Sequence, residues 1–195
     1  MIKACVIGWP ISHSRSPLIH GYWLKQHGID GSYSRIPVEP ENLATFLGGL
    51  KEAGFAGCNV TLPHKERAFD IVQHTDESTR RLGAVNTVFI RGGEIHGTNT
   101  DGEGFLDSLK SKVPALSLNG QRAVVLGAGG AAMAIVNALL LQGMSEVAVV
   151  NRSPGKAEQL RLRFGGKVRP VLWQQRADIL DDAALVVNTT SLGMK

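Results

Sequence analysis

Short apolar segments alternate with helical patterns along the whole chain, and this alternation predicts an α/β fold with parallel strands in both halves. Ser16 is the expected N-cap of the first helix, with Pro17 in its first turn. In the first half we expect helices at residues 16–27, 40–53 and 101–113 and one opening at Pro63, and strands at residues 3–8, 32–38, 55–60, 85–90 and 94–98, the last two joined as a hairpin by Gly92-Gly93.

The strands of the second half are more strongly apolar, as expected for a parallel sheet that is covered on both faces. The softer stretch 114–120 is the best candidate for a domain boundary, which gives domains at residues 1–113 and 114–195. The elements expected after this boundary are strands at residues 122–126, 146–150, 168–172 and 184–188 and helices at residues 131–142 and 154–164.

Composition narrows the class of protein. A chain of 195 residues that is 43% hydrophobic and 19% charged can bury a real core. No apolar segment approaches membrane-spanning length and none resembles a signal peptide, so we expect a cytoplasmic protein without a membrane partner. Cys5 and Cys58 lie in apolar strand patterns, which favours reduced core thiols over a disulfide or a metal site. The net charge of +4 comes without a nucleic-acid-binding motif, so small anionic ligands are favoured.

One lysine stands where local physics disfavours a cation. In Asn59-Val60-Thr61-Leu62-Pro63-His64-Lys65, Pro63 suits the first turn of a helix, so Lys65 faces the positive end of the helix dipole. Residues that break a local rule are often functional. The alternative is a solvated surface lysine beside Glu66, and both interpretations remain open on this segment alone.

A glycine turn marks the start of the second domain. Gly127-Ala128-Gly129-Gly130-Ala131-Ala132 follows an apolar strand and opens a helix, which is the context of a dinucleotide-binding turn. Gly127 permits the tight turn, and Gly129 and Gly130 let a pyrophosphate approach the helix N-terminus. The turn departs from the G-x-G-x-x-G spacing by ending in alanine. We therefore expect a Rossmann-like second domain.

Two further loops of this domain suit a nucleotide. The next strand ends in Asn151-Arg152-Ser153, with Lys156 one turn further, where an NAD-binding protein usually has an acidic residue. An arginine there accommodates a 2′-phosphate, which favours NADP(H). The loop that begins at Asn188 is rich in small polar side chains that suit the ribose or the nicotinamide, although a plain polar turn is the alternative; its candidate residues are Thr189, Ser191 and Met194.

Polar groups also collect in the first half. The hydroxyls of Ser14 and Ser16, together with free N–H groups of the helix that follows, would receive a carboxylate, unless Ser16 only caps that helix. Asn86 and the segment Asn99-Thr100-Asp101-Gly102 add further polar points. His13 and His64 could serve as acid–base groups, but as single histidines near helix starts both are expected to be peripheral to any chemistry.

Together these segments resemble the shikimate dehydrogenase family over essentially the whole chain. The residues that carry the resemblance are Ser14-Arg15-Ser16-Pro17, the segment from Asn59 to Lys65, Gly83-Ala84-Val85-Asn86-Thr87, Asn99-Thr100-Asp101-Gly102, the glycine turn, Asn151-Arg152-Ser153 and the Asn188 loop. Two positions depart from the family pattern, with Met133 where an arginine is frequent and His64 where phenylalanine is common.

The resemblance implies NADPH-dependent reduction of 3-dehydroshikimate to shikimate, a step of aromatic amino-acid biosynthesis. It makes Lys65 and Asp101 the catalytic pair and implies no metal at the site. It also implies two sets of binding residues. For substrate these are Ser14 and Ser16 at the carboxylate, Thr61, Asn86 and Asp101 at the ring hydroxyls, and Asn59. For cofactor they are Gly127, Gly129, Gly130, Ala131, Asn151, Arg152, Ser153, Lys156, Thr189, Ser191 and Met194.

Family members usually continue beyond the position of Lys195 with the rest of the sheet and a helix that packs on the substrate domain. The resemblance therefore implies that the C-terminal part of the second domain is missing here, and we expect low stability and little dehydrogenase activity from these residues alone. A quinate/shikimate-type dehydrogenase of broader specificity and a non-catalytic ligand-binding fragment are the alternatives. As a whole protein we expect a monomer or a homodimer with a small-molecule substrate.

Overall fold

The computed structural model describes residues 1–190 and 192, and the chain divides into two compact units, Met1–Thr100 and Asp101–Lys195. Helix α5 (Asp101–Lys112) therefore groups with the second unit, whereas the sequence analysis ended the first domain at residue 113. The reason is close packing of α5 on α6 (Gly130–Leu141), where an added Cβ at Gly102 would lie 3.0 Å from the Ala134 carbonyl oxygen. In the described part of the chain no helix has the length and apolar character to cross a membrane.

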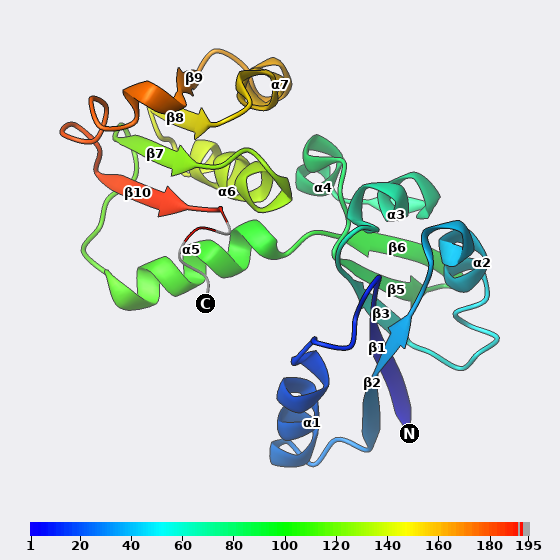
Figure 1. The fold of residues 1–195 in the computed structure, drawn as a ribbon. Helices are drawn as coiled ribbons and strands as arrows, with labels where there is room; N and C mark the ends of the chain where they lie inside the picture. Colours follow the sequence, from blue (N-terminus) through cyan, green and yellow to red (C-terminus); the bar gives the residue numbers. More distant parts are fainter. Residues whose placement is uncertain (191, 193–195) are drawn as a thin grey trace. The chain divides into compact units, whose positions relative to one another are not determined.

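The first unit is built on a six-stranded mixed sheet (Figure 1). The first three strands in sheet order are parallel, the next two pairs are antiparallel, and the edge pair β6–β4 is parallel again. In the order β2-β1-β3-β5-β6-β4, the strands are β2 (Gly31–Pro37), β1 (Ile2–Gly8), β3 (Gly57–Val60), β5 (Thr87–Arg91), β6 (Glu94–Thr98) and β4 (His74–Thr75).

Helices cover the two faces of this sheet unequally. Helix α1 (Ser16–Gln26) packs on β1 and β2 with none of its residues fully buried. On the core side, α2 (Leu43–Gly48) and α3 (Lys65–Ile71) close over inward-facing strand residues such as Ile7 and Val60. The other helical segments of this unit are the short 3₁₀ turn η1 (Pro40–Asn42) and α4 (Glu77–Leu82).

Cys5 and Cys58 are buried and unbridged on neighbouring strands, which confirms the prediction of reduced core thiols. A hydrogen bond between the two thiols and burial both raise the pKa of Cys58.

Several predicted helix boundaries were wrong for local reasons. The pattern at 40–53 forms only η1 and the six-residue α2, because Gly48 and Gly49 are poor helix formers. Arg15, not Ser16, is the N-cap of α1. Helix α3 begins at Lys65 with His64 as its N-cap, so Pro63 stands before the helix instead of in its first turn. The Leu62–Pro63 peptide is cis. The elements β4 and α4 are too short to give a periodic pattern and were not predicted.

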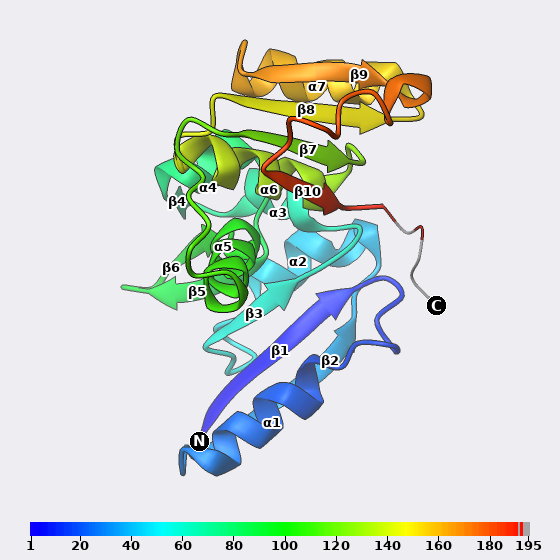
Figure 2. The ribbon, with the colours of Figure 1, turned by 90° about the vertical axis from the view of Figure 1, so that its left-hand side faces the viewer.

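The second unit has a four-stranded parallel sheet whose strand positions match the predicted ones closely. In the order β9-β8-β7-β10, visible from top to bottom in Figure 2, the strands are β9 (Val168–Leu172), β8 (Glu146–Asn151), β7 (Arg122–Leu126) and β10 (Leu185–Asn188). The chain builds outward from β7 to β9 and then returns to the other side of β7. The order of strands therefore reverses between β7 and β10, as at the switch point of a Rossmann-like sheet.

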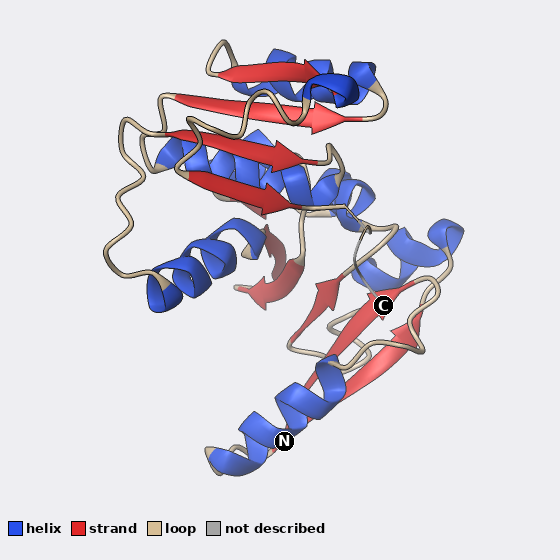
Figure 3. Cartoon of the chain, turned by 60° about the vertical axis from the view of Figure 1, so that its left-hand side comes forward, coloured by secondary structure: helices blue, strands red, loops and turns tan. Residues whose placement is uncertain are grey.

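Helices α6 and α7 (Pro154–Phe164) pack against this sheet, α6 on β7 and β8 and α7 on β8 and β9 (Figure 3). The central strands β7 and β8 carry nearly continuous buried valines and alanines, as predicted for strands covered on both faces. A short 3₁₀ turn, η2 (Trp173–Gln175), begins the connection from β9 to β10.

Replacing Gly57 by alanine is expected to lower the free energy of unfolding by about 1–3 kcal/mol. Gly57 lies in β3 between two strands, and an added Cβ would stand 2.3 Å from the Val88 carbonyl oxygen, which is backbone and cannot move aside as a side chain can. Urea unfolding measures the change. Gly48→Ala at the end of α2 is the matched control, because an added Cβ there meets nothing within 4 Å. Equal stability of the two variants would contradict this account of β3.

Candidate functional site

The polar segments of the first unit meet at one edge of its sheet. Parallel strands β1 and β3 end there, and because β5 is antiparallel to β3 and β6 to β5, β5 begins and β6 ends at the same edge. The Val60 amide donates to the Asn86 carbonyl at 2.7 Å, and the Asn86 amide donates to the Thr98 carbonyl at 3.0 Å. The predicted residues Thr61 and Asn86 are thus brought to one place by strand topology.

Ser14 and Ser16 lie in the loop between β1 and α1 with their hydroxyl oxygens 3.2 Å apart. The Ser16 amide donates to the Ser14 hydroxyl oxygen, the Leu18 amide donates to the Arg15 carbonyl, and Pro17 has no N–H. The expected contribution of free helix N–H groups is therefore absent from this first turn. The hydroxyl pair itself is the feature that can receive a carboxylate.

The Asn59 side chain is held by two neighbours that the sequence analysis did not single out. Its Oδ1 accepts from the Tyr33 hydroxyl at 2.6 Å, and its Nδ2 donates to the Thr87 hydroxyl oxygen at 3.1 Å. Burial raises the pKa of Tyr33, so the phenol remains a donor. A cleft of about 380 Å³ opens beside this group, lined among others by His20 and Phe89. The pairing of β1 with β2 brings Tyr33 here, and no local motif announces it.

Asn86 organises the segment that leads to Asp101. Its Oδ1 accepts from the Thr100 amide at 3.1 Å and its Nδ2 donates to the Thr100 hydroxyl oxygen at 3.1 Å. The Asn99 side chain donates to the Ala84 carbonyl at 2.9 Å. Asp101 follows directly as the first residue of α5 in the second unit. The pairing of Asp101 with Lys65 stays a prediction.

Lys65 is the first residue of α3 and is half-buried, so its predicted place in the first turn of a helix is confirmed. The neighbouring His64 is 1% exposed, and its Nε2 lies 2.7 Å from the Val38 carbonyl oxygen. Such burial agrees with the expectation that His64 is peripheral to the chemistry. The imidazole fills the core under α3 and bonds a backbone carbonyl there.

Asp76, which the sequence analysis did not single out, anchors the same edge from the side of α4. Its carboxylate caps α4 through the Thr79 amide at 2.8 Å and also accepts from the Thr98 hydroxyl at 2.7 Å. Partial burial raises the pKa of Asp76, but the hydrogen bonds from Thr79 and Thr98 outweigh it, so the pKa lies below the ordinary value. The pattern of an aspartate directly before a helical segment was the available signal.

Asp76→Ala is expected to lower the free energy of unfolding at neutral pH by about 1 kcal/mol through loss of the cap. Because the pKa of Asp76 is depressed on folding, its stabilisation is present above its unfolded pKa of about 3.9 and disappears as the pH falls through the folded value. Urea unfolding at pH 7 and pH 3 should therefore show a difference from the parent that shrinks in acid. Asp70→Ala on the exposed face of α3 is the control. A deficit that is unchanged at pH 3 would contradict the charge-dependent part.

In the second unit, the glycine turn and the Asn188 loop meet at the switch point. Gly127 has φ +108°, and an added Cβ would stand 2.4 Å from the Thr189 hydroxyl oxygen. Thr189 donates to the Leu126 carbonyl from both its amide, at 2.8 Å, and its hydroxyl, at 2.7 Å. The Gly127 amide donates to the Val150 carbonyl at 2.8 Å, which ties the turn to β8. Only glycine fits both the dihedral angle and the space at this position.

The start of α6 is open to an anion. Gly129 is its N-cap and Gly130 its first residue; both are exposed, and an added Cβ at either meets nothing within 4 Å. Among the described residues no side-chain hydrogen bond caps this terminus, so backbone N–H groups of the first turn are open to a bound anion. Ala131 is exposed in the same turn. The open space and the uncapped N–H groups suit an anionic group, and the pyrophosphate at this terminus stays a prediction.

Positive side chains stand at the tip of β8. The Asn151 side chain donates to the Ser153 carbonyl at 3.0 Å and shapes the tip, where Arg152, Ser153 and Lys156 are exposed. Arg152 and Lys156 thus follow β8, the strand to which the glycine turn is bonded. This is the position expected for residues that bind the 2′-phosphate of NADP(H). Met133 is buried in α6, after the glycine turn, and its sulfur lies 3.5 Å from Nη1 of Arg163 on α7. The sequence analysis did not assign Arg163 a role at this site.

The Asn188 loop is internally bonded. Asn188 Oδ1 accepts from the Thr190 amide at 3.0 Å and from the Thr190 hydroxyl at 2.7 Å. These bonds fix the residues on either side of Thr189, which itself bonds the Leu126 carbonyl. Two further predicted cofactor residues, Ser191 and Met194, lie outside the described residues.

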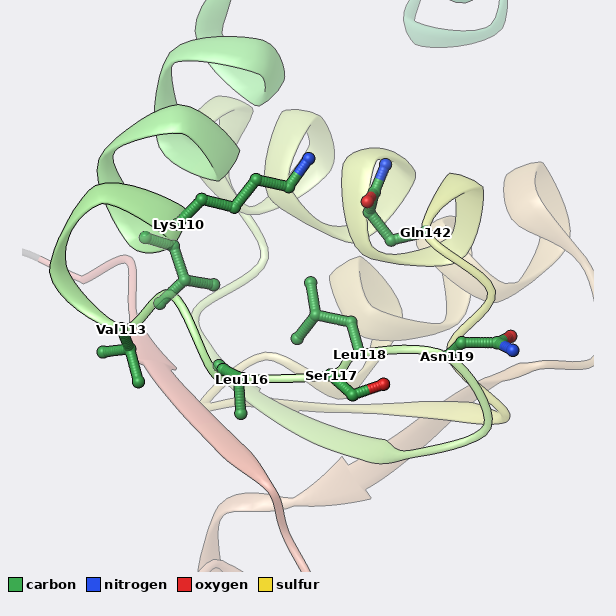
Figure 4. A pocket seen from close by; sticks show the side chains of 8 residues that line it. Lys110, Val113, Leu116, Ser117, Leu118, Asn119 and Gln142 are labelled. Atoms are coloured by element: carbon green, nitrogen blue, oxygen red, sulfur yellow. The ribbon is translucent and has the colours of Figure 1, made fainter.

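A separate cavity of about 230 Å³ lies at the opposite edge of this sheet (Figure 4). Lys110 and Val113 line it from the end of α5, Leu118 from the segment that precedes β7, and Gln142 from the end of α6. Ligands of open α/β sheets bind at the carboxyl ends of the strands. This cavity stands at the amino ends, so it is not the nucleotide site.

Fold and site together define a two-domain α/β protein. Its first unit carries polar residues where β1 and β3 end, and its second unit has a Rossmann-like sheet of the kind that binds dinucleotides. Comparison with known proteins agrees. Residues 6–88 match the shikimate dehydrogenase substrate binding domain, and residues 108–193 match the shikimate / quinate 5-dehydrogenase family.

Similar curated proteins are described as shikimate dehydrogenase (NADP(+)). The chain is 50% identical to a shikimate dehydrogenase (NADP(+)) of Mesorhizobium japonicum, over 98% of this chain and 68% of that protein. It is 49% identical to the one of Brucella abortus strain S19, over 98% of this chain and 66% of that protein. A crystal structure of shikimate 5-dehydrogenase from Thermus thermophilus with NADP(H) and shikimate matches with a TM-score of 0.86 at 38% identity, over 98% of this chain and 69% of that one.

The chain belongs to the shikimate dehydrogenase family. It spans about two thirds of the length of the curated relatives that it matches.

Proposed function

We propose that this chain carries the substrate site and the NADP(H) site of an enzyme that reduces 3-dehydroshikimate to shikimate in aromatic amino-acid biosynthesis. The observation that carries the proposal is the convergence of Thr61, Lys65 and Asn86 at one sheet edge, where β1 and β3 end and β5 begins. The family relationship supports it, and so does a similar structure that holds shikimate together with NADP(H).

The groups of the first unit suit a hydroxylated ring acid. The hydroxyl pair of Ser14 and Ser16, 3.2 Å apart, would bind the carboxylate oxygens. Asn59, Thr61 and Asn86 offer amide and hydroxyl groups for the ring hydroxyls. Asn59 is already oriented by Tyr33 and Thr87, so less conformational freedom is lost when a ligand binds.

Lys65 would serve the reacting carbonyl. NADPH supplies the hydride when it is bound, and the reduced carbonyl becomes an alkoxide that needs a proton or a nearby positive charge. The Lys65 ammonium can donate that proton to the developing oxygen. Asp101 would complete the pair by holding the ammonium in place. It follows Thr100, whose backbone is fixed by the Asn86 side chain.

The cofactor would bind at the switch point of the second unit. Gly127, Gly129, Gly130 and Ala131 would receive the pyrophosphate at the open start of α6. At the tip of β8, Arg152 and Lys156 would neutralise the 2′-phosphate, with Asn151 and Ser153 shaping the turn. Thr189, Ser191 and Met194 would complete the nicotinamide side.

Two alternatives keep the same architecture. One is a quinate/shikimate-type dehydrogenase of broader specificity, and the other is a ligand-binding fragment without turnover. Rates with quinate and shikimate test the first, and binding of shikimate and NADPH without turnover would favour the second. We further propose a cytoplasmic enzyme, monomeric or homodimeric, in line with the biosynthetic role of its relatives.

In a protein that joins these residues to the remaining part, about a third, of the length of its relatives, Lys65→Ala is expected to lower turnover about 10²- to 10⁴-fold, because the developing alkoxide loses its proton donor. Loss of NADPH absorbance in the presence of 3-dehydroshikimate measures it. Lys112→Ala, at the exposed end of α5, is the control and should keep the parent rate. Near-normal turnover after Lys65→Ala would remove Lys65 from the chemistry.

Arg152→Ala is expected to weaken NADP⁺ binding about tenfold or more while NAD⁺ binding changes little, because only NADP⁺ carries the 2′-phosphate. Titration calorimetry with both nucleotides gives the two affinities. Arg161→Ala on the same segment of the chain makes the same change in net charge, but Arg161 is bonded to Glu158 and stands further along α7. An equal loss for both nucleotides would place Arg152 elsewhere in the site.

A further inference from the structure

We propose that His74, Glu94 and His96 form a binding site for a divalent transition-metal ion of the Zn²⁺ type at the outer edge of the first unit's sheet. None of these three residues belongs to the proposed substrate or cofactor sites. The role that we assign to the ion is structural.

Strand register brings the three side chains together. His74 in β4 is the direct partner of His96 in β6, and Glu94 stands two residues before His96 in the same strand. Side chains two residues apart on a strand lie on the same face, and direct partners of adjacent strands share a face. The strand pairing and the two-residue spacing therefore place all three side chains on one face of the sheet. Figure 2 shows β6 and β4 at the same end of this sheet.

The ligand atoms are already close. One nitrogen of each imidazole and a carboxylate oxygen of Glu94 all lie within 4.8 Å of one another, and His74 Nε2 is 2.9 Å from Glu94 Oε2. Zn²⁺ binds nitrogen and oxygen at about 2.0–2.2 Å, which puts tetrahedral ligand atoms about 3.3 Å apart. A modest contraction of the cluster would reach that spacing.

Packing restricts the His96 side chain, whereas the side chains of His74 and Glu94 are free to change rotamer. His96 is half-buried, stacked between Phe89, at 5.4 Å, and His74, at 4.6 Å between ring centroids. The side chains of His74 and Glu94 are 48% and 58% exposed, so both can rotate toward a bound ion. The nearly parallel rings must tilt apart before a metal can lie in both ring planes. The exposed His74 ring can make this movement.

The donor set selects the kind of ion. Two imidazoles and one carboxylate suit Zn²⁺ and its neighbours, with water in the fourth position. Ca²⁺ and Mg²⁺ prefer oxygen donors alone and fit poorly. A bound ion would join β4, which has only two residues, to β6. The next residue, Asp76, already bonds Thr98 at the end of β6, so the ion would add a second clamp between the same segments.

Equilibrium dialysis and thermal unfolding of the chain with Zn²⁺, after treatment with a chelator, test the proposal. We expect saturable binding of one ion per chain and a higher unfolding temperature, since an ion that binds only the folded state stabilises it. His74→Ala and Glu94→Gln should each weaken binding about tenfold or more. His27→Ala, an exposed histidine after α1, should bind as the parent does, and Mg²⁺ should give no rise.

Co²⁺ substitution gives a second readout, because its visible absorption reports four-coordinate ligation, and His96→Ala should abolish that band. If His96→Ala fails to fold, the exposed positions His74 and Glu94 carry the test. The absence of saturable Zn²⁺ binding, or binding that survives both His74→Ala and Glu94→Gln, would overturn the proposal and leave an ordinary His74–Glu94 hydrogen bond. Neither outcome depends on turnover, so the proposed dehydrogenase function stands or falls separately.

Discussion

The backbone and side chain of Asn86 are the connection on which the first site depends. Its carbonyl accepts from Val60 at the end of β3, its amide donates to Thr98 at the end of β6, and its side chain holds Thr100. A single residue thus ties its own segment to two others, the end of β3 before Thr61 and the segment from Thr98 to Asp101. Without these bonds the hydroxyl and amide groups would lie on three independent loops. The same functional groups would be present, but their relative positions would no longer be fixed.

Local signals predicted most of the fold correctly. The apolar strands of the second unit and the Gly92-Gly93 hairpin were recognisable because burial on both faces and tight turns leave strong patterns. The division into compact units differs from the predicted domain boundary at residues 113 and 114. The division after Thr100 follows from the contact of α5 with α6, which composition does not encode.

The candidate site was predictable where its residues lie in continuous motifs. Tyr33 and Thr100 were not assigned a role, because Tyr33 acts through a partner distant in the sequence and Thr100 is held through its backbone amide. Asp76 was missed although it caps α4 locally, and its bond to Thr98 is long-range. Lys65 shows a subtler case. Its position in the first turn of α3 was predicted from Pro63, yet Pro63 lies before the helix. The right placement came from a partly wrong argument about how the helix begins.

The contact of Gly127 with Thr189 has a consequence for biosynthesis. Thr189 bonds the Leu126 carbonyl across a separation of 63 residues, and Gly127 is shaped to lie against it. During translation the first strand of the second unit leaves the ribosome long before β10 exists. The bonds between the end of β7 and the Asn188 loop can therefore form only after that loop has emerged, so a nascent chain released earlier would carry the glycine turn without one side of its switch point.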